Sequence, residues 1–165
     1  MIKTAVITIS DKGSRGERED GTGPALRHLL EKHGYQIDYY KMIPDEQDLI
    51  EKELIHLCDM FTLDLIITNG GTGFSKRDVT PEATRNIIEK HVPGISETMR
   101  MKSLAITPKA MLSRGISGIR KNTLIINLPG SPKAAVENLA FVIPALEHGI
   151  DILKGTASEC AVEPK

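Results

Sequence analysis

Residues 63–84, LDLIITNGGTGFSKRDVTPEAT, place an apolar strand, a glycine-rich loop and a helix start in direct succession. The run 63–68 is rich in strand formers and too short for a buried helix. Thr80, Pro81 and Glu82 then supply an N-cap, a proline for the first helical turn and an acid that suits the helix dipole. This succession of strand, loop and helix is typical of a parallel α/β sheet.

The same alternation of strand and helix continues on both sides of this unit. Strands are predicted at residues 2–10, 36–41, 115–119 and 123–128, where short runs are apolar and often β-branched. Helices are predicted at residues 24–33, about 45–60, from 80, 93–106, 108–114 and from about 132 to 154, with Pro144 interrupting the last one. The pattern therefore predicts an α/β fold whose mostly parallel sheet carries helices on both faces.

Length and composition describe an ordinary globular chain. Its 165 residues are 40% apolar and 26% charged, which suits a single domain over 1–165 with a polar tail at 155–165. No apolar run reaches the roughly 18 residues of a membrane span, and the chain enters a strand without a signal-peptide layout. Cys58 and Cys160 are far apart and form no CxxC pair. We therefore expect a cytoplasmic protein without a membrane partner, a disulfide framework or a zinc ribbon.

Charge is distributed unevenly along the chain. The net charge of −1 and the 4% aromatic content argue against a nucleic-acid partner. Residues 93–133 nevertheless carry +6, which leaves −7 on the rest of the chain. The seven basic residues of this segment are Arg100, Lys102, Lys109, Arg114, Arg120, Lys121 and Lys133. The segment indicates either a local anionic ligand, such as a phosphate cluster, or a solvated or subunit-facing surface.

Three of the predicted strands end in loops of Gly, Ser, Thr, Asp and Asn, and ligands bind beyond the carboxyl ends of parallel strands. The candidate substrate-binding residues of these loops are Ser10, Asp11, Gly70, Gly71, Thr72, Gly73, Ser75, Pro129, Gly130, Ser131 and Lys133. Glycine amides, hydroxyls and a lysine can together bind a phosphate or a carboxylate. The loops match neither the Walker A nor the GxGxxG pattern. The alternative is a set of tight turns that use glycine for geometry alone.

Two aspartates near these loops are candidates for the chemistry. Asp78 precedes a helix on the predicted ligand rim, where a carboxylate could hold Mg²⁺, orient a reacting group or simply interact with the helix N-terminus. Asp45 also precedes a helix, so its position alone favours an ordinary N-cap. The five histidines show no metal-ligand spacing, and no GxSxG elbow is present. These components suit phosphoryl or nucleotidyl transfer, which depends on positioning and charge neutralisation.

Three parts of the sequence are the runs ITISD (7–11), GGTG (70–73) with RDVTPEAT (77–84), and LPGSPKA (128–134). Together they resemble the MogA/MoaB family of molybdenum cofactor biosynthesis, to which the gephyrin G domain belongs. The resemblance extends from Ile2 to about Gly155. It implies a three-layer α/β/α fold with a mixed sheet, assembled as a homotrimer or a homohexamer. The activity it implies is molybdopterin adenylyltransferase, which joins AMP from Mg·ATP to the phosphate of molybdopterin.

Motif by motif, this resemblance assigns roles to five residues. The two functional aspartates, linked to Mg²⁺, fall on Asp45 of IPDE and Asp78 of RDVTPE. The pterin-binding hydroxyls fall on Thr72, Ser103 and Ser113. The resemblance thus favours a catalytic Asp45 over the N-cap interpretation. The alternatives are a non-catalytic or weakly active MoaB-like pterin-binding protein, and an unrelated phosphosugar or nucleotide enzyme on a similar fold.

Overall fold

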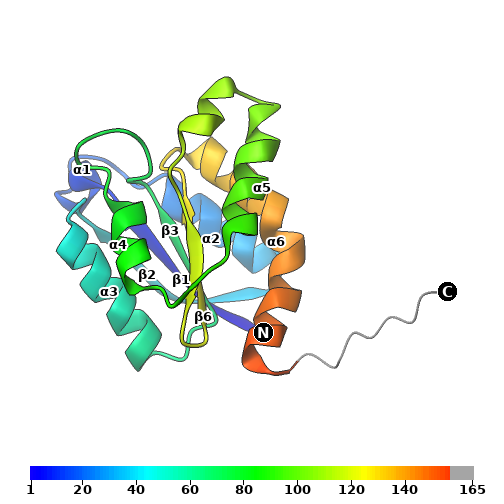
Figure 1. Cartoon of the computed structure of the whole chain (residues 1–165). Coiled ribbons are helices and arrows are strands. Elements are labelled where there is room, and N and C mark those ends of the chain that lie inside the picture. Colours follow the sequence, from blue (N-terminus) through cyan, green and yellow to red (C-terminus); the bar gives the residue numbers. More distant parts are fainter. Residues whose placement is uncertain (157–165) are drawn as a thin grey trace.

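The structure is a computed structural model, drawn as a ribbon in Figure 1, and it describes residues 1–156. Within that range six strands form one sheet in the order β2-β1-β3-β6-β5-β4. The central strands are β1 (Ile2–Ile9), β3 (Leu65–Asn69) and β6 (Thr123–Leu128). They pair in parallel with each other and with β2 (Tyr35–Ile43). The remaining strands, β5 (Ser117–Arg120) and β4 (Lys90–His91), pair antiparallel. The predicted mostly parallel, mixed sheet is confirmed.

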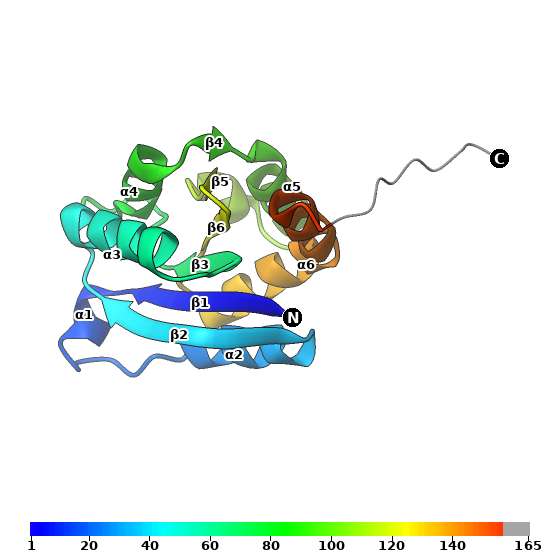
Figure 2. The ribbon, with the colours of Figure 1, turned by 90° about the horizontal axis from the view of Figure 1, so that it is seen from below.

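Helices cover both faces of this sheet, as Figure 2 shows. Helices α3 (Gln47–Met60) and α4 (Thr80–Ile87) lie on one face. Helices α2 (Thr22–Lys32), α5 (Pro93–Leu104) and α6 (Pro132–Lys154) lie on the other. Two short helices, α1 (Asp11–Ser14) and the 3₁₀ helix η1 (Pro108–Leu112), lie in the connections. None of the helices in residues 1–156 is long and apolar enough to span a bilayer.

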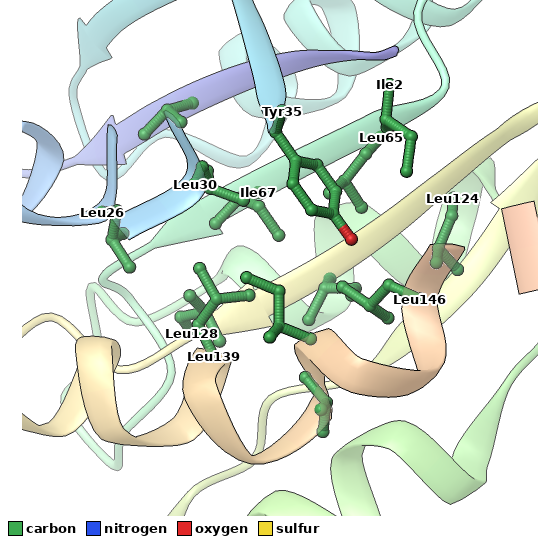
Figure 3. Packing of buried hydrophobic residues seen from close by; sticks show 14 of the residues in the cluster. Ile2, Leu26, Leu30, Tyr35, Leu65, Ile67, Leu124, Leu128, Leu139 and Leu146 are labelled. Atoms are coloured by element: carbon green, nitrogen blue, oxygen red, sulfur yellow. The ribbon is translucent and has the colours of Figure 1, made fainter. Parts of the chain in front are cut away.

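The alternation of side chains along β3 divides the core into two layers. Leu65 and Ile67 face α2, α5 and α6, whereas Ile66 faces α3 and α4. Figure 3 shows the first layer, in which the ring of Tyr35 points from the strands toward α6. Both faces of β3 are therefore buried, as a parallel central strand requires.

Several element boundaries that we predicted from the sequence differ from those in the structure. The predicted break at Pro144 is wrong, because α6 runs without interruption to Lys154. Pro144 and Ala140 are both exposed, so the Ala140 carbonyl that loses its N–H partner faces water. On the opposite side of α6, Leu139, Leu146 and their buried neighbours hold the helix against the sheet. Helix α1 and strand β4 were not predicted, and residues 157–165 of the predicted tail, with Cys160, lie outside the described range.

The carboxyl ends of β1, β3 and β6 meet at one rim, where Thr8 lies opposite Asn69 and Asn69 opposite Leu128. The amide of Gly70 donates to the Leu128 carbonyl at 3.1 Å. Gly70 has a φ of +101°, and a Cβ there would collide with the Ile9 carbonyl, so only glycine fits. This close approach brings the three predicted loops together.

Candidate active site

Two adjoining pockets lie at this rim, on either side of the GGTG loop (residues 70–73). The larger, which we call the aspartate pocket, has a volume of about 560 Å³, and its lining includes Ser10, Asp45, Gly70, Gly71, Asp78, Gly130 and Ser131. The smaller, which we call the serine pocket, has a volume of about 290 Å³, and its lining includes Thr72, Gly73, Ser103, Ser113 and Pro129. Twelve of the predicted site residues therefore gather in two neighbouring pockets.

Asp45 lies in the aspartate pocket and is not a helix cap, because α3 begins at Gln47 with Glu46 in the cap position. Its Oδ2 accepts the Asp11 amide at 2.8 Å, and its own amide donates to Asp11 Oδ1 at 3.1 Å. Burial raises the pKa of Asp45, and the carboxylates of Asp11 and Asp78 raise it further. The site thus holds a carboxylate where negative charge is unfavourable, and a cation there would relieve that cost.

Arg77 connects the start of α1, which follows β1, to the loop that carries Asp78. Its guanidinium donates to both Asp11 oxygens, at 3.0 and 2.9 Å, and to Glu46 Oε1 at 2.9 Å. The hydrogen bonds from Arg77 lower the pKa of Asp11. The side chain of Asp11, a predicted substrate-binding residue, is thus engaged with Arg77 and lines neither pocket.

Asp78 is held by a tight turn at the other side of the aspartate pocket. Its Oδ2 accepts the Ser75 amide at 3.0 Å, and its own amide donates to the Ser75 carbonyl at 3.0 Å. A Cβ at Gly73 would lie 2.9 Å from Asp78 Oδ2, so a side chain there would displace the carboxylate. Ser75 lines neither pocket and instead positions Asp78 through its backbone.

The serine pocket brings together the three predicted pterin-side hydroxyls, those of Thr72, Ser103 and Ser113. Ser103 Oγ donates to Asn138 Oδ1 at 3.2 Å. Arg100 also lines the pocket and donates to the Gly115 carbonyl at 2.8 Å. Hydroxyls, a guanidinium and amides around a partly apolar cavity suit a flat, polar heterocycle that carries an anionic group.

The basic segment 93–133 does not form one patch. Arg120 and Lys121 pair with Asp59, at 2.9 and 3.0 Å. Arg114 pairs with Glu82 and donates to the carbonyls of Gly73 and Asp78, which braces the GGTG loop. Two of the seven bases, Arg100 and Lys109, line the serine pocket. Lys133, a predicted substrate-binding residue, has an 81% exposed side chain and lines neither pocket.

The donor set of the aspartate pocket fits a Mg²⁺ ion that arrives with phosphates. Within residues 1–156, no three His, Cys, Asp or Glu side chains gather as a ready-made metal site. Mg²⁺ usually takes only one or two carboxylates from the protein and completes its shell with water and substrate phosphates. Asp45, Asp78 and the Ser10 hydroxyl offer oxygen ligands of this kind, and the unfavourable charge on Asp45 favours a cation.

Sequence reasoning missed several polar residues of the aspartate pocket, among them Asp20 and Asn69. Asp20 accepts the Thr8 hydroxyl at 2.6 Å and the amides of Thr22 and Gly23 at 2.9 Å. An aspartate before Gly21 and a helix is a known start signal, so its capping role could have been found. Asn69 stands at the start of a predicted rim loop, but its contacts with the neighbouring strand cannot be predicted from the linear sequence.

The fold and the rim loops define a ligand-binding α/β protein, and the chain belongs to the family described as "Probable molybdopterin binding domain", which matches residues 5–148. Molybdopterin adenylyltransferase from Helicobacter pylori (strain ATCC 700392 / 26695) is 46% identical over 93% of this chain and 89% of its own. The enzyme of the same name from Escherichia coli K12 is 40% identical over 90% and 80%.

A solved structure shares this architecture. The molybdopterin biosynthesis enzyme MoaB from Thermus thermophilus superposes with a TM-score of 0.90 at 48% identity. The match covers 94% of this chain and 98% of that one. The three-layer α/β/α fold that the motifs implied is therefore confirmed.

Proposed function

We propose that this protein is a molybdopterin adenylyltransferase of molybdenum cofactor biosynthesis, which joins AMP from ATP to the phosphate of molybdopterin. One observation carries the proposal: the aspartate pocket and the serine pocket share the GGTG loop as a common wall. Two ligands bound in these pockets would have their phosphates next to each other across that loop. The names of the bacterial relatives support the same activity.

The lining of each pocket suggests which ligand it takes. In the proposal, the triphosphate of ATP lies in the aspartate pocket, where Gly130 and the start of α6 offer amide donors. Molybdopterin lies in the serine pocket, where Ser103 and Ser113 contact the pterin. The remaining hydroxyl, that of Thr72, stands on the shared wall.

The reaction needs no strong general base, because the phosphate of molybdopterin is already anionic. One of its oxygens attacks the α-phosphorus of ATP and forms a new P–O bond. The bond from the α-phosphorus to its bridging oxygen breaks, and pyrophosphate leaves with the electron pair. Asp45 and Asp78 would hold Mg²⁺, which when bound supplies positive charge against the phosphates. The backbone amides of the loops orient the two phosphates for in-line displacement.

The direct test is to incubate the purified protein with molybdopterin and Mg·ATP, and to quantify adenylyl-molybdopterin and pyrophosphate. The proposal predicts that both accumulate in equal amounts. Binding of molybdopterin without either product would support the non-catalytic MoaB-like alternative instead. If the protein neither binds molybdopterin nor forms product, both interpretations are wrong.

We also propose that the protein acts in the cytoplasm, as one domain over residues 1–165 that assembles into a homotrimer or a homohexamer. Large apolar side chains near the serine pocket support assembly, since Met101, Ile106 and Met111 are 65%, 52% and 62% exposed. Sedimentation velocity would separate the two oligomers from a monomer.

A further inference from the structure

Arg114 connects the walls of the two pockets. It directly follows Ser113 of the serine pocket, in the connection between η1 and β5. Its Nη2 donates to the carbonyl of Asp78, in the wall of the aspartate pocket, at 2.7 Å. Arg114 itself lines neither pocket. Any effect of Arg114 on a bound ligand must therefore pass through the residues that it holds.

The second half of the GGTG loop is held by Arg114. The carbonyls of the first two glycines are bound by the hydroxyl and the amide of Thr80, at 2.9 and 3.1 Å. The Arg114 amide donates to the Thr72 carbonyl at 2.9 Å, and Nε of Arg114 donates to the Gly73 carbonyl at 2.7 Å. Within residues 1–156, Thr72 and Gly73 have no hydrogen bond except these two. Their position therefore depends on this arginine.

The guanidinium is itself anchored to a helix that belongs to the core. Nη1 of Arg114 pairs with Glu82 in the first turn of α4, and Ile87 near the end of that helix is buried against the sheet. The carboxylate of Asp78 lies so close to Gly73 that a Cβ on Gly73 would be 2.9 Å from Oδ2. A shift of either backbone segment would therefore displace this carboxylate.

Each pocket also has walls that do not depend on Arg114. Asp45 and Gly130 line the aspartate pocket, and Ser103 on α5 lines the serine pocket. Loss of the arginine should therefore spare most contacts of each ligand but disturb the wall between them. We propose that Arg114 is a positioning residue, which holds the GGTG loop and Asp78 so that the phosphates of the two ligands align for transfer. This inference rests on the proposed function.

The first test separates alignment from binding. In Arg114→Ala, the single-turnover rate of adenylyl transfer at saturating Mg·ATP and molybdopterin should fall about 10²-fold, because a shift of about 1 Å has that effect. The Kd of each ligand, measured by calorimetry, should change by less than about threefold. Arg114→Lys should lose a similar factor in rate, since a single ammonium cannot serve several acceptors in a fork. A wild-type rate in Arg114→Lys would show that charge alone matters, and it would overturn the inference.

Arg120 provides the matched control. Its guanidinium also joins a carboxylate to a backbone carbonyl: it donates to Asp59 at 3.1 and 2.9 Å and to the Ile87 carbonyl at 3.0 Å. It lies opposite Thr123, at the end of the sheet away from the rim. Arg120→Ala should lower the Tm about as much as Arg114→Ala and keep the wild-type rate. Equal loss of rate in the two alanine variants would reduce the role of Arg114 to stability.

The second test measures the alignment without turnover. Mn²⁺ is supplied with α,β-methylene-ATP, which cannot release pyrophosphate, and phosphorus NMR follows the relaxation of the molybdopterin phosphate. Paramagnetic Mn²⁺ accelerates this relaxation, and the effect falls steeply with distance. We expect about threefold weaker acceleration in the Arg114 variants than in the wild type and Arg120→Ala, as for a shift of about 1 Å. Equal acceleration in all of these proteins would overturn the inference.

Folding of each variant is checked first by circular dichroism, and Arg114→Lys carries both tests if Arg114→Ala does not fold. The outcome is separable from that of the proposed function. Weaker acceleration in the Arg114 variants, with no adenylyl transfer by the wild type, would leave the positioning role standing and reject the enzyme. Equal rates of adenylyl transfer in the wild type and the Arg114 variants would establish the enzyme and reject the role of Arg114.

Discussion

Asp45 shows how a single side chain combines an unfavourable charge with a fixed position. The backbone amide of Asp11 donates to its carboxylate at 2.8 Å and fixes its position. Burial and the charges of Asp11 and Asp78 raise the pKa of Asp45 above the usual 3.8, whereas Arg77 acts in the opposite direction. A raised carboxyl pKa stabilises the fold only at low pH, and that contribution disappears as pH rises through the folded-state pKa. At neutral pH the ionised Asp45 therefore destabilises the metal-free protein.

Asp45→Asn should consequently stabilise the metal-free protein while it abolishes adenylyl transfer. The amide oxygen of Asn can still accept the Asp11 amide, but it carries no charge. We expect the Tm at pH 7 to rise by about 1–3 °C, which corresponds to less than about 1 kcal/mol in a domain of this size. Calorimetry at about pH 3.5, near the unfolded-state pKa, should show that the gain has vanished. The exposed Asp38→Asn is the control, and a lower Tm for Asp45→Asn at pH 7 would contradict the argument.

Asp78→Asn should fold normally and lose about 10²–10³ in the rate of adenylyl transfer, because it removes a group that positions charge. The amide retains an oxygen that can accept the Ser75 amide, so the turn survives. Single-turnover kinetics with Mg·ATP and molybdopterin would measure the rate, with Asp38→Asn again as the matched control. Near wild-type turnover by Asp78→Asn would remove this residue from the mechanism.

Ser103→Ala and Ser113→Ala should separate a binding role from a role in assembly. Both hydroxyls line the serine pocket. We therefore expect the Kd for molybdopterin to rise about five- to tenfold, since one lost hydrogen bond contributes about 1 kcal/mol. The Kd for ATP should stay unchanged. A change in sedimentation together with an unchanged Kd for molybdopterin would instead place these residues at a subunit interface.

The sequence could predict those site residues that lie in short loops after recognisable strands. Asp78 and Thr72 belong to one continuous motif after a recognisable strand, so their placement at the rim followed once that strand was known. Asp45 was a candidate only through the family resemblance, because its position alone favoured an N-cap. Partnerships between distant side chains could not be predicted in this way. Asp11 was assigned to substrate, but its carboxylate is bound by Arg77, which lies 66 residues further along the chain. Lys133 has the right chemistry, but its side chain points into solvent.

At the scale of elements, the helix-covered parallel strands were predictable from periodicity, and the errors have local causes. Strand β4 consists of two exposed residues, too few for any pattern to emerge. Helix α1 has only four residues, capped by the Ser10 hydroxyl, and it falls in a stretch whose glycines predict a loop. Helix α6 continues past Pro144 because packing on its buried face outweighs the backbone hydrogen bond lost on its exposed face.

This account of α6 predicts that Pro144→Ala stabilises the protein. Alanine restores the amide that can donate to the Ala140 carbonyl and removes the clash of the proline ring. We expect the Tm to rise by about 2–4 °C, equivalent to about 1 kcal/mol. Pro93→Ala is the control, because Pro93 occupies the first turn of α5, where proline costs nothing, and its Tm should not rise. An unchanged or lower Tm for Pro144→Ala would mean that the helix is already adapted to the proline.

At the scale of the whole molecule, topology accounts for the site. Parallel pairing of β1, β3 and β6 directs three loops to one rim. The close approach of Gly70 to the Ile9 carbonyl brings the loops after β1 and β3 together. The excess positive charge of residues 93–133 could not be interpreted from the sequence, because several of its bases brace loops or pair with Asp59 far from the pockets. Charge counted along the chain does not give charge at a site.

The central claim is that two ligands bind at once, on either side of the GGTG loop. It is tested most directly by titrating molybdopterin into the wild-type protein saturated with Mg²⁺ and α,β-methylene-ATP, which cannot release pyrophosphate. We predict one molybdopterin and one nucleotide bound together per chain, with a Kd for molybdopterin no weaker than in the absence of nucleotide. Displacement of one ligand by the other would show that they share a single pocket, and it would contradict this account.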